Sequence, residues 1–406
     1  MASTSTPTRL RVAQIAITGV CVLLGLAVTV MASSRRADVD RAVRASSVVV
    51  AAQDLGAALG TADAASANAF LAGGVDQPEQ RERYVTALDA ATAALQVAAE
   101  TALSDDAREA VQELSQQLGT YTGLVETARA YNRQQLPLGA AYLRSASRLL
   151  RTEVAVQLDA LQAAGDDSFR AVDQNLTAGV SRSLLALTLF VATVLVGIQV
   201  WLSGLTHRLF NAGLLGASLL LLVGMMWVLN AVSNSATRAR TATSSGYDNL
   251  SALSAIRSDA YDQQTFSTFA LVDRGSRDSF NAQAATAANN VDARIAALGS
   301  TSLTAPWRIY RDLSQQVTAT DTGGSYAAAR DQLTAPIDAT SSVLGAFASF
   351  DQSVVEEVIT SGDLLTSGLD DARRPIEQLR VVGVILCLLA AVTGAWGLQK
   401  RINDYR

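Results

Sequence analysis

The sequence predicts an all-α integral membrane protein, with four transmembrane helices and two tandem extracytoplasmic four-helix bundles that are continuous with them. Three observations lead to this prediction. The chain of 406 residues contains four long apolar stretches, and none of them carries a charged residue. Two polar segments of similar length separate the first stretch from the second and the third from the fourth. In both segments apolar residues recur at helical spacing, and nothing of length alternates as a strand would.

The four apolar stretches are long enough, or nearly so, to cross a hydrocarbon core of about 30 Å as helices. The first can be read as an anchor or as a signal peptide cleaved near Val30-Met31-Ala32. Its apolar core of about 20 residues exceeds that of a typical signal peptide, which favours the anchor. The predicted segments are a tail at 1–11, spans at 12–31, 183–205, 209–232 and 381–398, bundles at 32–182 and 233–380, a turn at 206–208 and a tail at 399–406.

Basic residues in the short segments set the predicted orientation. With a cytoplasmic N-terminus, the inner segments are basic and contain a single acid, Asp404, whereas both polar segments are net acidic. Both termini are therefore predicted to be cytoplasmic, in a multi-pass protein of the cell membrane, with both bundles outside. The candidate contacts for a cytosolic partner are Arg9, Arg11, Arg208, Lys400 and Arg401.

The two halves of the chain read as copies of each other. Asp63-Ala64 recurs as Asp259-Ala260, and aromatic and aliphatic residues match at the same offset beyond this pair. The segment Glu113–Leu118 recurs as Asp312–Val317, with Leu-Ser-Gln-Gln in common. This shared segment favours duplication over the chance alignment of alanine-rich helices.

Each polar segment shows four helical stretches separated by turn signals. In the third stretch of the first segment, one heptad stripe comprises Val111, Leu114, Leu118, Tyr121 and Val125. The predicted breaks fall at Gly73-Gly74 to Pro78, Ser104–Asp106, Leu136-Pro137, Asp273–Ser276, Gly299–Pro306 and Asp321–Ser325, and Pro336 is predicted to start or kink the last helix.

The sequence lacks the residues that several kinds of catalytic and metal site require. The only histidine, His207, lies in the three-residue inner turn, and both cysteines, Cys21 and Cys387, lie in apolar stretches. The outer segments therefore cannot form a zinc cluster or a nucleophile–histidine pair. No enzyme activity, catalytic residue, metal, cofactor or nucleic-acid partner is predicted.

The membrane-distal turns are the candidate binding sites for a protein partner, because they are polar and lie at the ends of helices. These tip residues are Gly73, Gly74, Arg133, Pro137, Asp273, Arg274, Gly324 and Tyr326. A second set of arginines either binds an anionic ligand or forms a solvated helix face. Its members are Arg81, Arg83, Arg133, Arg144, Arg148 and Arg151.

The layout resembles bacterial sensors that hold a periplasmic four-helix bundle between two spans, as in chemoreceptors. A closer resemblance is to the actinobacterial GlnX-type membrane signalling proteins. It rests on the whole layout and on the segments Ala62-Asp63, Phe70–Gly74, Leu136–Arg144 and Ser258–Asp262. The resemblance implies a relay from an extracytoplasmic amino-acid-binding lipoprotein to a cytosolic Ser/Thr kinase, which would tune nitrogen metabolism.

The sequence leaves three functions open. The first is that relay, with a substrate-binding lipoprotein outside and a kinase inside. The second is direct sensing of a small molecule in an arginine-lined groove between helices. The third is a structural scaffold of the cell envelope. The identity of the ligand, the oligomeric state and the direction of signalling are not encoded in any motif.

Overall fold

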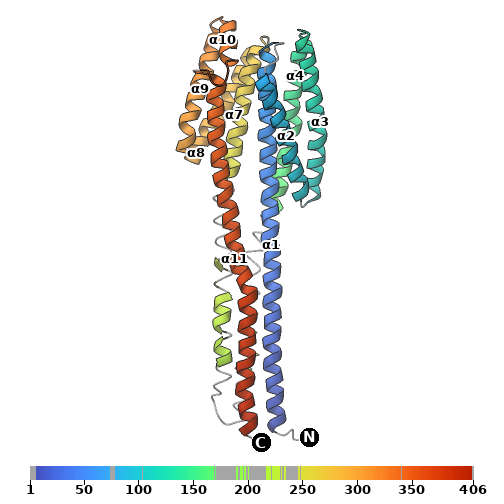
Figure 1. The fold of residues 1–406 in the computed structure, drawn as a ribbon, viewed down its shortest axis with the longest axis vertical. Helices are drawn as coiled ribbons and strands as arrows, with labels where there is room; N and C mark the ends of the chain where they lie inside the picture. The colour runs from blue at the N-terminus through green and yellow to red at the C-terminus, as the bar shows by residue number, and fades with distance from the viewer. Residues whose placement is uncertain are drawn as a thin grey trace. The chain divides into compact units, whose positions relative to one another are not determined.

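The computed structural model describes residues 6–73, 78–102, 104–168, 248–339 and 341–404, with scattered positions between 170 and 246. Every element in these ranges is helical, as predicted (Figure 1). The first half contains α1 (Thr6–Leu71), α2 (Pro78–Thr101), α3 (Asp105–Arg133), α4 (Leu138–Leu149) and the π-helical turn η1 (Leu150–Val154), after which α-helix continues to residue 168. The second half contains α7 (Asp248–Val272), α8 (Arg277–Leu298), α9 (Thr301–Thr322), α10 (Tyr326–Leu333) and α11 (Val343–Asp404).

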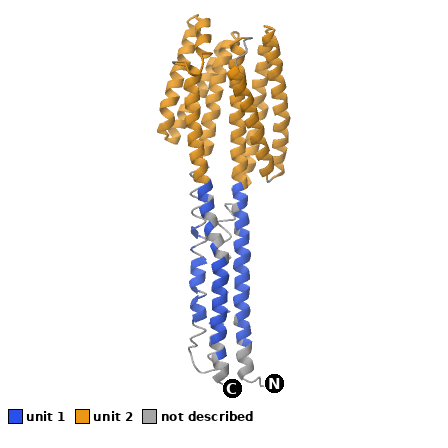
Figure 2. Cartoon of the chain, viewed as in Figure 1, with its two compact units in different colours: residues 1–43, 170–243, 366–406 blue, residues 44–169, 244–365 orange. Residues whose placement is uncertain are grey.

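The chain divides into two compact units (Figure 2). Unit 1 comprises residues 1–43, 170–243 and 366–406, which include the four apolar stretches. Unit 2 comprises residues 44–169 and 244–365, which belong to the two polar segments. Helices α1 and α11 each contribute residues to both units.

In unit 1, α1 and α11 pack along a seam of small side chains. A Cβ atom at Gly25 would lie 3.5 Å from the Cβ atom of Cys387, and one at Gly383 would lie 2.8 Å from Val28. Glycine at both positions therefore allows the two helices to approach closely. The other faces expose apolar side chains, namely Ile15, Leu23, Val30, Leu388, Val392 and Trp396. Such apolar exposure suits contact with lipid.

One helix in the described part of the chain is long and apolar enough to cross a membrane, at the N-terminal end of α1. Shorter apolar helices occur at Gly216–Val228 and Val381–Trp396. The predicted span 183–205 lies largely outside the described residues, whereas about half of the span 209–232 is described. The apolar helix of α1 indicates membrane association, and the four-span topology stays a prediction.

Helix ends in unit 2 follow the local sequence. Ser104 accepts a hydrogen bond from the backbone N–H of Ala107 (3.2 Å) and so caps α3. Pro137 directly precedes α4, as predicted. Gly299 ends α8 in the left-handed conformation, at φ +70°. Ser342 caps α11 through the N–H of Gly345 (3.1 Å), and Pro336 lies in the turn before it.

One predicted break was too long. The break expected at Gly299–Pro306 closes after Ser300, and Pro306 lies inside α9. Ser300 accepts a hydrogen bond from the backbone N–H of Leu303 (3.3 Å), so the capping serine sets the helix start ahead of the proline.

The two halves of unit 2 have different cores. The first half is packed largely with alanine and leucine from α1, α2, α3 and the helix after η1, including Ala52, Ala58, Ala91, Ala98, Ala107, Leu114 and Leu161. The predicted stripe on α3 faces inward, with Leu114, Tyr121 and Val125 buried. The second half is packed with aromatic rings from α7, α9 and α11, including Tyr261, Trp307, Tyr310, Phe347 and Phe350.

The two halves of unit 2 also pack on each other. Ala64 and Leu71 of α1 belong to the aromatic core of the second half. Phe269 of α7 packs with Ala128 and Leu143 of the first half. A Cβ atom at Gly60 would lie 3.2 Å from the Cβ atom of Tyr261, so α1 and α7 approach closely there. The two predicted bundles are therefore not independent, because they share a packed interface.

Candidate functional site

The α3–α4 turn carries an exposed tip. Residues 133–138 are all exposed, and this run includes the predicted tip residues Arg133 and Pro137. Leu136 and Leu138 on either side of the proline are 43% and 49% exposed. Two leucines held in solvent at the end of a helical pair suit contact with another protein.

Several contacts fix the geometry of this tip. A Cβ atom at Gly139 would lie 2.9 Å from the Ala128 carbonyl oxygen and 3.0 Å from the Phe70 ring, so only glycine fits. The Asn132 side-chain amide donates to the carbonyl oxygen of Phe70 (3.2 Å), which ties the turn to α1. Gln135 has φ +54°, a left-handed conformation that non-glycine residues seldom adopt. These contacts therefore hold the α3–α4 turn in one conformation.

The neighbouring α1–α2 turn is less fully described. Gly73 is exposed and has φ +70°, which closes α1 in the way glycine permits. Gly74, the other tip residue predicted there, lies outside the described residues.

The tips of the second half are occupied by contacts within the chain. Arg274 pairs with the buried Asp321 (2.6 Å) and lies over the Tyr326 ring at 4.8 Å. Asp273 pairs with Arg144 of α4. These predicted tip residues thus link the α7–α8 turn to the α9–α10 turn and to the first half. Gly324 is exposed, with φ +91°.

The candidate cytoplasmic contacts are placed only in part. Arg9 and Arg11 lie on α1, and Lys400 and Arg401 lie on α11, where the backbone alone is described. Arg208 lies outside the described residues.

A buried ion cluster joins the two halves of unit 2. Asp63 of α1 is 2% exposed and accepts a hydrogen bond from the Ser147 hydroxyl (2.6 Å). Arg151, in the π-helical turn, contacts Asp63 (3.2 Å) and Asp262 of α7 (2.9 Å). The same guanidinium lies 4.4 Å from the centre of the Phe266 ring. Arg151 therefore bridges carboxylates from both halves.

The pKa values of the two carboxylates reflect this burial. Burial raises the pKa of Asp63, and the nearby Arg151 and Ser147 offset part of the rise. Burial likewise raises the pKa of Asp262, against the lowering effect of Arg151. One carboxylate oxygen of Asp63, Oδ1, has no hydrogen-bond partner in the described structure. The cluster is therefore only partly satisfied.

Two of the arginines considered as anion ligands are thus engaged elsewhere. Arg144 and Arg151 form ion pairs between the two halves, so they do not line a free anion site. Arg81, Arg133 and Arg148 are exposed and Arg83 is partly exposed. No local sequence pattern distinguished these two roles.

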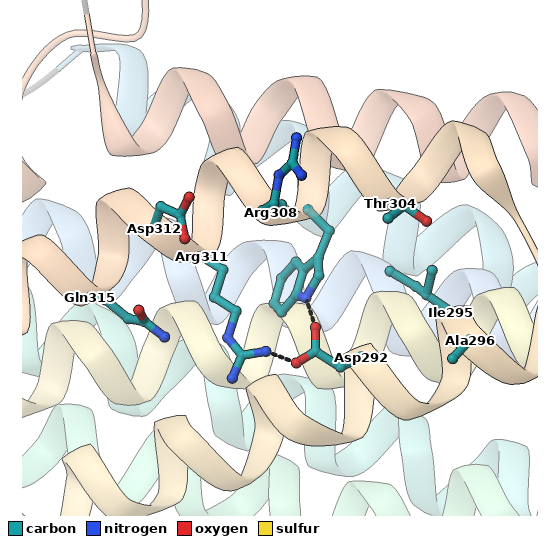
Figure 3. A pocket seen from close by; sticks show the side chains of 9 residues that line it. Asp292, Ile295, Ala296, Thr304, Arg308, Arg311, Asp312 and Gln315 are labelled. Atoms are coloured by element: carbon teal, nitrogen blue, oxygen red, sulfur yellow. Dashed lines mark hydrogen bonds and ion pairs between the residues drawn. The ribbon is translucent and has the colours of Figure 1, made fainter.

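A groove with mixed charge lies between α8 and α9 (Figure 3). Its volume is about 440 Å³, within the size range of small-molecule sites. The Trp307 indole N–H donates to Asp292 Oδ1 (2.7 Å), and Arg311 pairs with the same carboxylate. Trp307 is the only tryptophan outside the apolar stretches, a signal that could have drawn attention to this groove from sequence.

The described residues contain no group of three or more histidine, cysteine, aspartate or glutamate side chains that could hold a metal ion.

Comparison with known proteins gives one match. Residues 38–174 match the family model of the actinobacterial sensor domain. No curated protein and no solved structure matches the chain. The family match and the all-helical fold together support a helical bacterial sensor domain, and hence a sensing role, in this part of the chain.

Proposed function

We propose that the protein is a multi-pass transmembrane signalling relay rather than an enzyme. A protein partner binds the exposed tip of the first half outside the cell membrane. Binding shifts the helices, and this shift passes along them to the basic inner segments, where a cytosolic partner binds differently in the two states. The observation that carries this proposal is the sensor-domain match over the first half, combined with its exposed leucine tip.

Helix continuity supports the relay. Helix α1 has 66 residues and joins an apolar stretch to the first half of unit 2 without a break. Helix α11 has 62 residues and does the same for the second half. A shift or rotation of such a helix outside the membrane can pass into its apolar part, because the helix has no loop to absorb it. The energy available is the partner's preference for one state over the other.

The partner classes come from the resemblance to GlnX-type proteins. The outer partner proposed is a substrate-binding lipoprotein that reports amino-acid status. The inner partner proposed is a Ser/Thr protein kinase, which would contact Arg9, Arg11, Arg208, Lys400 and Arg401. Both termini are proposed to be cytoplasmic and both helical segments extracytoplasmic.

Photocrosslinking in cells tests this function. A photoreactive amino acid at Gln135 should capture a lipoprotein, and capture should change with extracellular amino acids. Replacing Leu136 and Leu138 by serine should reduce capture from Gln135. Glu109, on the outer face of α3, supplies a control position where no capture is expected. The relay fails if capture from Gln135 is absent or equals that from Glu109.

A second candidate function is direct sensing of a small molecule. The α8–α9 groove favours it, because the groove combines a tryptophan with charges of both signs. Thermal stabilisation of the purified protein by a small molecule, with no partner present, would support this function. A scaffold without a switch remains the third candidate, and no observation in the structure favours it.

A further inference from the structure

We propose that the groove between α8 and α9 binds a small zwitterion of the α-amino-acid class. This inference rests on the sensing role proposed above and assigns it a site in the second half of unit 2. The groove has a fixed floor and a charged rim, and the matching positions of the first half carry different residues.

The floor of the groove is held in place from below. Trp307 is 3% exposed and packs against the rings of Tyr310 and Phe350, at centroid distances of 5.5 and 5.0 Å. Its indole N–H points at Asp292 on α8 (2.7 Å). Asp292 therefore has a fixed orientation before any ligand arrives, which lowers the entropy lost on binding.

Arg311 is also fixed, yet incompletely paired. One of its terminal nitrogens pairs with Asp292, and the other donates to Asn289 (3.1 Å). Its Nε atom is buried and has no acceptor in the described structure. A buried donor without an acceptor is destabilising, so the hydrogen bonding of Arg311 is incomplete within the chain. Figure 3 shows Arg311 extending from α9 to Asp292 on α8, which places the guanidinium in the middle of the groove.

The rim carries one free charge of each sign. Arg308 and Asp312 both line the groove and are exposed, and neither makes a hydrogen bond or ion pair with any described residue. They are four residues apart on α9, so their Cβ atoms lie about 5–6 Å apart. Because Arg311 and Asp292 neutralise each other, the rim leaves one cation and one anion to be matched. A molecule with a carboxylate and an ammonium group a few ångströms apart matches both.

The first half of unit 2 carries different residues at the positions that match the groove. In the sequence repeat, Glu109 and Glu113 of α3 stand where α9 has Arg308 and Asp312. Gln96 stands at the position of Asp292. Two acids in place of a cation and an anion do not complement a zwitterion, so these positions provide a matched control.

The test uses the full-length protein in nanodiscs, with Trp201, Trp227 and Trp396 replaced by phenylalanine so that Trp307 is the only indole. Each of the common L-amino acids is titrated while Trp307 emission is recorded. Acetate and methylammonium serve as probes with one charge each. At least one amino acid should give a saturable change, with no saturable change from either single-charge probe.

Rim variants locate the site. Arg308→Gln and Asp312→Asn should each raise the Kd about tenfold or more, the scale of one charge-assisted hydrogen bond. Glu113→Gln in the first half should leave the Kd unchanged. Both rim residues are exposed, so these variants should fold as the parent does, and the melting temperature checks this.

Three results would overturn the proposal. The first is no change in Trp307 emission with any amino acid at about 10 mM, a concentration well above a weak Kd of about 1 mM. The second is an equal change with acetate, and the third is a Kd that both rim variants leave unchanged. The relay is tested separately. Capture of a lipoprotein at Gln135 without any response at Trp307 would retain the relay and remove the groove.

Discussion

The two halves of unit 2 have similar helical layouts but different interiors. The first is packed mainly with alanine and leucine, whereas the second is packed with tryptophan, tyrosine and phenylalanine. The first presents an exposed leucine tip, and the second ties its tip down with Arg274 and Asp321. The comparison teaches that one helical layout can present two different surfaces: an exposed leucine tip on one half and a polar groove on the other.

The largest effect should come from breaking the contact that joins the halves. Arg151→Ala leaves the buried Asp63 carboxylate without its counter-charge. Removing one member of a buried pair is destabilising by about 3–5 kcal/mol. Thermal and denaturant unfolding of the full-length protein in detergent would measure the loss.

Arg148→Ala is the matched control, since Arg148 lies one turn away and is exposed. Its effect should stay within about 0.5 kcal/mol. Similar stabilities for the two variants would show that the bridge between the halves contributes little.

A smaller effect should come from the tip of the first half. In Gly139→Val, the new Cβ atom would meet the Ala128 carbonyl oxygen and the Phe70 ring. Overpacking of this kind is destabilising by about 1–3 kcal/mol. Gly119→Ala on the same α3–α4 pair meets nothing within 4 Å and should instead stabilise α3 by about 0.5–1 kcal/mol. Opposite signs for the two glycines, read from melting temperatures, are the expected outcome, and equal signs would contradict it.

The next effect concerns pH. Burial raises the pKa of Asp63 in the folded state above its unfolded value. Such a group stabilises the fold fully below its unfolded pKa, and the contribution is lost as pH rises through the folded pKa. The melting temperature should therefore fall as pH rises above the unfolded pKa of an aspartate.

Asp63→Asn removes this titration, so the fall with pH should become shallower. Asp54 and Asp262 also have pKa values raised by burial, so part of the slope should remain. An identical slope in the variant and the parent would count against Asp63 as a source of the pH dependence.

The smallest effect on stability should follow Leu136→Ser combined with Leu138→Ser. Both side chains are largely in solvent, so the change in unfolding free energy should stay within about 0.5 kcal/mol per site. The same double variant should reduce partner capture. Loss of capture with an unchanged melting temperature would distinguish the exposed tip of the first half from the ion-paired tip of the second. A large loss of stability would mean that the two leucines are structural.

Local features of the fold could be predicted from the sequence. Ser104, Pro137 and Gly299 act through their own backbone and nearest neighbours, so their roles are visible in a short window. Pro306 misled the prediction, because the cap at Ser300 starts α9 before it.

Long-range features could not be predicted in this way. Arg144 and Arg151 look like other surface arginines until α7 is placed against α4. The repeated Leu-Ser-Gln-Gln also faces differently in the two halves. In the first half its leucine, Leu114, is buried. In the second half its serine, Ser314, is buried and its leucine, Leu313, is half-buried. Ser314 accepts a hydrogen bond from the buried Gln263 (2.8 Å), a partner that only tertiary packing supplies.

The close contact of Gly60 with Tyr261 has a consequence for how the protein responds to the concentration of a ligand or partner. Its two sides belong to one polypeptide, so their association does not depend on protein concentration. Identical subunits must present the same surface to each other, but fused halves need not, and here Arg151 of the first half pairs with Asp262 of the second. A signal received by one half is then a single binding event per chain, so a sigmoidal onset in its titration would have to come from contact between chains.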